Sequence, residues 1–189
     1  MLSSKCWFPN SLVGPGTIIP LGKPRAEWKV TQRLTEHESQ MEAGAVQDGS
    51  RPSFAAVKFR CHDINDPSKE AFMRVYLQIP YAGTESEPAA ERARQARTRY
   101  LPDELNALRS MTSQGSTITP RLLGYMEDKQ DESGWVPGGF IVYLAWKIVP
   151  GVRLGDHFEA VEFWKLSPDD RDAVRLAFSR GFEYDYIID

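Results

Sequence analysis

Three charged residues lie in segments whose composition predicts rigid structure. Lys58 and Arg74 each lie in a run of apolar and β-branched residues that predicts a strand, and Glu104 lies among good helix formers. A cation on a rigid strand can sit beside a phosphate, and a carboxylate on a helix can hold that cation in position. These residues are therefore candidates for an anion-binding site. Taken singly, each is more often an exposed residue on an edge strand or a helix surface.

The two strands that carry the cations are predicted to form a hairpin. Residues 54–61 and 72–79 are strand-like, and the segment 63–68 between them contains the Asx and Pro residues that favour a chain reversal. The glutamate lies in the helical segment 89–111, which Pro102 divides. We expect one helix to end near residues 99–100, and a second to begin with Pro102 in its first turn. A buried stripe is predicted for this second helix: Leu101, Leu105, Leu108 and Met111.

Further strands are predicted at 28–34, at 120–126 and within 138–154, the last being a buried strand that leaves through Pro150 and Gly151. Residues 36–49 fit either a short helix or a second strand through 43–47. Near the C-terminus, Ser167 followed by Pro168 and three acids (Asp169, Asp170 and Asp172) is typical of a helix start. We expect that helix to continue to Arg180 or beyond.

This order predicts an α+β fold with a mostly antiparallel sheet packed against one principal helix. The density of Pro and Gly in residues 1–27 predicts an irregular N-terminal arm with a short extended piece at 17–19. We therefore divide the chain into that arm (1–27), a sheet domain (28–152), and a linker with a C-terminal helix (153–189).

Composition excludes several classes of function. A net charge of −3 gives no electrostatic case for binding nucleic acid or an anionic membrane. No apolar run reaches the roughly 18 residues that span a bilayer, and the N-terminus lacks the apolar core of a signal peptide. Two cysteines, Cys6 and Cys61, are predicted to be reduced thiols in the cytoplasm or nucleus. The histidines His37, His62 and His157 lack metal-ligand spacing, so no metal-binding set is expected.

Two other groups of side chains could form a binding surface. Four arginines between positions 92 and 99 form a basic cluster, which neighbouring acids dilute, so we expect a solvated helix face. Aromatic residues are numerous between positions 158 and 186, and an exposed apolar patch usually marks a partner surface.

The order of motifs resembles the N-terminal lobe of the protein-kinase-like superfamily, and is similar to fungal kinase-like and aminoglycoside-phosphotransferase-like proteins. Ala55–Lys58 resembles the V-A-I-K strand motif, Glu104–Leu108 resembles the helix whose glutamate pairs with that lysine, and Tyr143–Gly151 resembles the fifth strand and hinge. The resemblance implies ATP as the ligand, with Trp146 at the gatekeeper position. Backbone groups from Lys147 to Val149 would then face the adenine. In an alternative alignment Arg74 replaces Lys58 as the phosphate-facing residue.

Departures from the family pattern shape the functional hypothesis. The first strands enclose no G-x-G-x-x-G loop, and the sequence ends before the position expected for an H-R-D-type catalytic loop or a D-F-G-type metal-binding segment. We therefore expect a catalytically incomplete, kinase-like binding or regulatory module. It would meet a protein partner, or a second copy, through the face left by the missing lobe. The alternative is an ATP-dependent phosphotransferase whose catalytic lobe comes from another chain or a longer product.

Overall fold

The computed structural model describes residues 6–44, 51–151, 154–155 and 160–185, with side chains described to residue 180. The chain divides into two compact units, residues 1–148 and 149–189. In the linker predicted to begin at residue 153, residues 153 and 156–159 lie outside the described residues.

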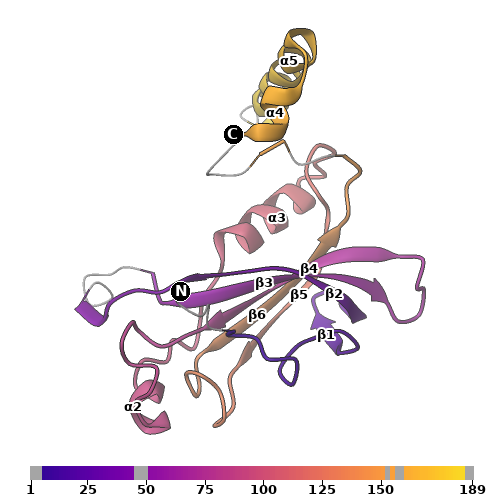
Figure 1. The fold of residues 1–189 in the computed structure, drawn as a ribbon. Helices are drawn as coiled ribbons and strands as arrows, with labels where there is room; N and C mark the ends of the chain where they lie inside the picture. Colours follow the sequence, from indigo (N-terminus) through magenta and orange to yellow (C-terminus); the bar gives the residue numbers. More distant parts are fainter. Residues whose placement is uncertain (1–5, 45–50, 152–153, 156–159, 186–189) are drawn as a thin grey trace. The chain divides into compact units, whose positions relative to one another are not determined.

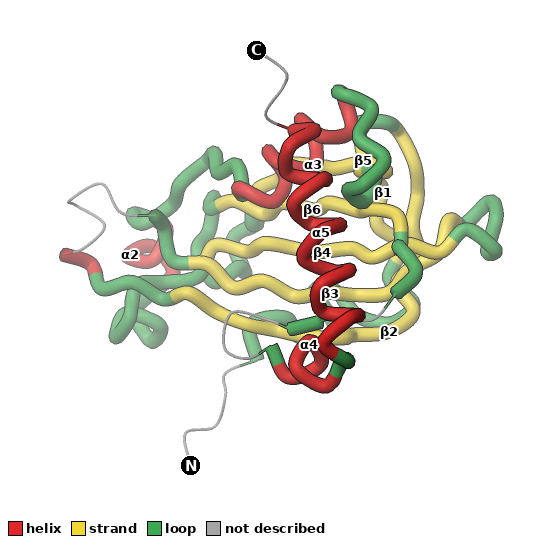
Figure 2. The backbone as a smooth tube through the Cα atoms, turned by 90° about the horizontal axis from the view of Figure 1, so that it is seen from above, coloured by secondary structure: helices red, strands yellow, loops and turns green. Residues whose placement is uncertain are grey.

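The first unit is built on one six-stranded sheet (Figure 1). Its strands are β1 (Ile18–Gly22), β2 (Arg25–Ser39), β3 (Phe54–Asp63), β4 (Glu70–Gln78), β5 (Leu122–Lys129) and β6 (Phe140–Lys147). Their order is β1-β2-β3-β4-β6-β5, with every pairing between these strands antiparallel. Figure 2 shows β2, β3, β4 and β6 running side by side. The fold is therefore α+β with an antiparallel sheet, as predicted.

The two edges of the sheet meet at one end. Lys23, in the turn between β1 and β2, exchanges two backbone hydrogen bonds of 3.2 Å with Tyr125 of β5. Gly124 permits this approach, because a Cβ at that position would lie 3.2 Å from Leu21 and 3.3 Å from the carbonyl oxygen of Pro24. The sheet is consequently closed at this end into a partial barrel. Pro20 is tolerated because β1 is an edge strand, where a missing N–H breaks no interior ladder.

Side chains alternate between two faces of the sheet, and each face has its own apolar cluster. On β3, β4 and β6, even-numbered residues share one face with α3 (Asp103–Ser113), and we call it the helix face. Odd-numbered residues point to the other, the arm face, where Trp7, Phe8 and Val13 of the N-terminal arm are buried. Figure 1 shows α3 and the arm on opposite sides of the sheet.

The predicted arm, residues 1–27, contains β1 and the start of β2, and its irregular part, described from residue 6 to residue 17, is firmly held. The backbone N–H of Trp7 donates to Glu36 of β2 at 2.8 Å, and its indole N–H donates to Glu38. The indole N–H of Trp135, in the loop after β5, donates to the carbonyl oxygen of Trp7 at 2.9 Å. The arm thus spans from β2 to the β5–β6 loop and covers the open side of the partial barrel. The irregular backbone predicted for residues 1–27 is found in the described residues before β1, but the extended piece expected at 17–19 is a strand that runs to Gly22, and β2 already begins at Arg25.

The helix predicted to run from residue 89 to residues 99–100 is shorter in the structure. A short helix, α2, covers Ala89–Ala93 and stops well before the predicted end at residues 99–100. Buried Gln78 accounts for this, because its side chain donates to the carbonyl oxygen of Gln95 and accepts from the N–H of Arg97, both at 2.8 Å. These backbone groups bond to a strand residue and not to a helical turn. In the next helix, Pro102 is the N-cap of α3.

The stripe predicted for α3 is correct only in part. Leu105 is fully buried, and Leu108 packs half-buried against the same cluster. Leu101 is 41% exposed and precedes the helix, so its inclusion in the buried stripe was wrong.

The second unit contains two helices, α4 (Val161–Lys165) and α5 (Pro168–Asp185). The predicted cap is confirmed: the hydroxyl of Ser167 accepts from the N–H of Asp170 at 3.1 Å and donates to the carboxylate of Asp170 at 2.7 Å. Arg171 and Arg175 on α5 lie over the rings of Trp164 and Phe163 on α4, at 5.4 and 5.3 Å. These contacts hold the short helix against the long one.

Candidate anion-binding site on the helix face

The register of the sheet brings the two candidate cations together. Lys58 of β3 is directly opposite Arg74 of β4, and both are even-numbered residues on the helix face. Arg74 is opposite Leu144 of β6, and Phe72 is opposite Trp146. Side chains directly or diagonally opposite on one face are within contact distance. The middle of the helix face therefore holds two cations beside two aromatic rings.

Glu104 supplies the carboxylate from α3. The guanidinium Nη1 of Arg74 lies 2.8 Å from Oε2 of Glu104, and the two side chains are 24% and 25% exposed. Glu104 lies in the first turn of α3, where the helix dipole favours a negative charge. Because both side chains are mostly buried, this pair is more rigid than an exposed surface ion pair. Arg74 is thus fixed between a central strand and the helix that packs on it.

Tyr76 completes the arrangement. Its hydroxyl donates to the same Oε2 atom of Glu104 at 2.9 Å. Burial, and next the charge of Glu104, raise the pKa of Tyr76 well above its usual value. The phenol consequently stays protonated and remains a donor at any physiological pH. Glu104 therefore has two donors from one strand, Arg74 and Tyr76.

Aromatic rings support the cations. The ammonium of Lys58 lies 3.7 Å from the ring centre of Phe72 and 5.6 Å from that of Trp146. The guanidinium of Arg74 also lies 5.6 Å from the ring of Trp146. Such contacts position a cation without neutralising it. Lys58 and Arg74 are thus two basic side chains held beside aromatic rings on the helix face, a setting that suits an anionic ligand.

Arg74 retains an unused donor. Its Nε atom is buried and has no hydrogen-bond partner among the described residues. A buried donor without a partner carries a desolvation cost that a bound acceptor would relieve. The position is therefore suited to an oxygen-rich ligand or to an ordered water molecule.

Four of the six predicted site residues are gathered on the helix face: Lys58, Arg74, Glu104 and Trp146. Lys147 is elsewhere, because as an odd-numbered residue of β6 its exposed side chain is on the other face. Its backbone N–H already donates to the carbonyl oxygen of Arg121 at 2.9 Å. Val149 belongs to the second unit and is 51% exposed. Lys147 is therefore not gathered with the other four residues on the helix face.

Sequence reasoning missed Phe72 and Tyr76. Both lie two positions from Arg74 in a segment that was predicted to be a strand. The period of two residues places them on the face of Arg74. That signal was present in the sequence and identifies both residues once Arg74 is taken as the centre of the site.

Within the described part of the chain, no group of three or more His, Cys, Asp or Glu residues is arranged to hold a metal ion. None of the described helices is long and apolar enough to cross a membrane. Comparisons with protein-family models, curated proteins and solved structures found no match to this chain. The functional argument therefore rests on the geometry of the helix face.

Proposed function

We propose that this chain is a kinase-like binding module that recognises the phosphates of a nucleotide, with ATP as the candidate ligand, on the helix face of its sheet. The ion pair between Arg74 and Glu104 carries the proposal. In protein kinases a strand lysine and a glutamate of the following helix form a pair that positions the nucleotide phosphates. Here a strand arginine and a glutamate of the next long helix make the corresponding contact at 2.8 Å.

Element order supports the same proposal. Counted from β2, Arg74 lies on the third strand, α3 follows, and β5 and β6 complete a five-stranded set. The kinase pair likewise joins the third strand to the helix after it. Of the two alignments considered, this arrangement favours Arg74 as the phosphate-facing residue, with Lys58 as a second cation one strand away. The guanidinium would present a planar fork where a lysine presents a point charge.

A regulatory role would also require a surface for a partner protein. In the second unit, Trp164 is 61% exposed and Phe178 is 71% exposed, and exposed aromatic residues are enriched at interfaces. We propose that this unit meets a protein partner or a second copy of the chain. The unpaired cysteines, Cys6 and Cys61, suit action in the cytoplasm or nucleus.

Calorimetry with ATP and ADP, with and without Mg²⁺, tests the nucleotide proposal. We expect saturable binding in the micromolar range, and Arg74→Met should weaken it by about tenfold or more because one charge-assisted phosphate contact is lost. Lys69→Met is the matched control, since it removes the same charge from the turn of the same hairpin. No binding at millimolar nucleotide, or equal loss in both variants, would refute the proposal.

A further inference from the structure

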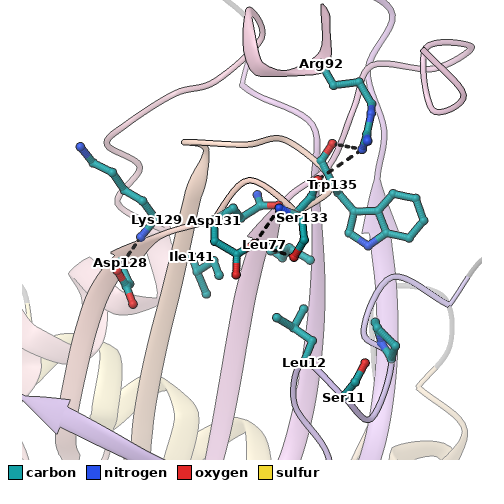
Figure 3. A pocket seen from close by; sticks show the side chains of 13 residues that line it. Ser11, Leu12, Leu77, Arg92, Asp128, Lys129, Asp131, Ser133, Trp135 and Ile141 are labelled. Carbon is teal, nitrogen blue, oxygen red and sulfur yellow. Dashed lines mark hydrogen bonds between the residues drawn. The ribbon is translucent and has the colours of Figure 1, made fainter. Parts of the chain in front are cut away.

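The arm face holds a cavity that the phosphate site does not use. Its volume is about 780 Å³, within the range of small-molecule sites. It lies between the N-terminal arm and the loop that joins β5 to β6, beside the open side of the partial barrel. Figure 3 shows Ser11 and Leu12 on the arm side, Asp131 and Ser133 on the loop side, and Leu77 and Ile141 between them.

The floor of the cavity is apolar and rigid. Leu77 of β4 and Ile141 of β6 are opposite each other in the sheet and are buried in the arm-face core. Leu12 adds a partly exposed side chain from the arm, and Trp135 adds a ring from the loop. An apolar body of a ligand would therefore meet aliphatic and aromatic surface already held in place.

Hydrogen bonds within the protein also hold the walls of the cavity in place. Arg92 donates through Nε to the carbonyl oxygen of Glu87 at 3.0 Å, and through Nη1 to the carbonyl oxygens of Gly134 (3.4 Å) and Trp135. The side chain of Gln130 donates to the carbonyl oxygen of Gln78 at 2.8 Å and accepts from the N–H of Val136 at 3.0 Å. These two polar side chains are committed to holding the loop. Arg92 is thus a structural residue. The sequence had predicted that it would belong to a solvated basic helix face, and for this residue that prediction was wrong.

Four charged side chains line the cavity: the carboxylates of Asp128 and Asp131, the ammonium of Lys129, and the guanidinium of Arg92, which is bonded to backbone carbonyl oxygens. The hydroxyl of Ser133, and then its N–H, bond to the Asp131 carboxylate and lower its pKa, so it stays ionised at neutral pH. Figure 3 shows the Lys129 side chain extending away from the Leu77 and Ile141 floor. With Arg92 bonded to carbonyl oxygens and Lys129 extended away from the floor, the two carboxylates are the charged groups left for a ligand, and beside an apolar floor they favour a cation with an apolar body.

We propose that this cavity binds a small organic amine, with its apolar body on Leu77 and Ile141 and its ammonium group at the carboxylates of Asp128 and Asp131. The site is separate from the proposed phosphate site, since Leu77 and Ile141 face the other side of the sheet from Arg74. Its ligand is also of opposite charge. The two sites can therefore be tested independently on the same protein.

A series of probes with one body and three head groups tests the charge preference. Calorimetry with 4-phenylbutylamine, 4-phenyl-1-butanol and 4-phenylbutyrate should give saturable binding of the amine. The alcohol should bind about tenfold more weakly, because it lacks the charge-assisted contact, and the carboxylate more weakly still. Equal affinity for the three probes, or no binding of the amine at millimolar concentration, would overturn the proposal.

Two pairs of variants locate the binding. Leu12→Lys places a cation at the cavity and should abolish amine binding, whereas Leu34→Lys makes the same change at another partly exposed leucine, outside the cavity. Asp128→Asn should weaken the amine several-fold without changing the alcohol, and Asp169→Asn, in the second unit, is its control. Circular dichroism establishes that each variant is folded. Unchanged amine affinity in a folded Leu12→Lys protein would contradict the assigned site.

Discussion

The two faces of one sheet differ in what they are made of, although they come from the same strands. On the arm face, Val57, Phe59 and Met73 are fully buried in an apolar cluster that the N-terminal arm covers. On the helix face, the residues between them along the same strands include Lys58 and Arg74, held over aromatic rings. Alternation along a strand thus places the candidate phosphate-binding residues on one face and the core that the arm covers on the other. Truncations in the arm-face core should act mainly on stability, and substitutions at Lys58 and Arg74 mainly on nucleotide binding.

The largest effect is expected from truncating the arm-face core. Phe59→Ala removes a fully buried ring from β3 and should lower the free energy of unfolding by about 3–5 kcal/mol. Phe72→Ala, on the helix face of β4, is the matched change at a half-buried ring and should cost less than half as much. Urea unfolding of both variants measures the difference. Equal losses would remove the distinction between the faces.

Alkaline pH should also act through the arm face. Burial, with a smaller contribution from Asp128, raises the pKa of Tyr143 from 10.0 to about 12. Because the unfolded chain releases this proton first, the contribution of Tyr143 to stability is complete below pH 10 and declines as the pH rises toward 12. A shift of this size corresponds to roughly 3 kcal/mol.

Urea unfolding of Tyr143→Phe between pH 9 and 12 isolates that contribution. The buried thiol of Cys61, whose pKa burial raises from 9.0 to about 12, should add a similar decline that begins at lower pH. The variant should retain the contributions of Cys61 and of Tyr76, whose pKa is also raised, and lose only the share of Tyr143 in the decline that begins near pH 10. An identical pH profile in the variant and the natural chain would contradict the assignment to Tyr143.

On the helix face, the ion pair should contribute modestly to stability. A double-mutant cycle with Arg74→Met and Glu104→Gln should give a coupling energy of roughly 1 kcal/mol, because both side chains are about three-quarters buried and hydrogen-bonded. Thermal and urea unfolding of the four proteins supply the cycle. A coupling near zero would mean that the pair does not position Arg74.

The smallest effect on stability is expected at Lys58. Lys58→Met keeps the aliphatic stem and removes the contact between the ammonium and the Phe72 ring, which should cost about 0.5–1 kcal/mol. The same change should weaken ATP binding several-fold. A large stability loss without a change in nucleotide affinity would assign Lys58 to the core and not to the site.

Much of the sheet was predictable from the sequence because strand periodicity is local. The runs around Lys58 and Arg74, with an Asx- and Pro-rich turn between them, predicted the hairpin that the structure contains. The same periodicity shows that Trp146 and Lys147 cannot share a face. The partner of Glu104 was not predictable in this way, because it depends on where α3 packs across the sheet. Register and helix placement are tertiary properties that no local pattern specifies.

Other features depended on contacts between distant residues. Residues 95–97 were predicted to be helical from composition, but they bond to the buried Gln78 side chain. The cavity is formed by an irregular arm and a loop whose contact, Trp7 with Trp135, joins residues far apart in the chain. The intrinsic secondary-structure propensities of the residues do not predict either of these contacts. The sequence therefore predicted the elements better than it predicted the surfaces they create.

The most direct test of the difference between the faces uses the tryptophan indoles as reporters. Trp146 lies beneath the two cations on the helix face, whereas Trp7 and Trp135 lie on the arm face. Indole N–H signals in a ¹⁵N–¹H spectrum, assigned by single substitutions, can be followed during titration with ATP. The account predicts that the Trp146 signal shifts saturably while those of Trp7 and Trp135 stay in place. Movement of Trp7 or Trp135 with a stationary Trp146 would contradict it.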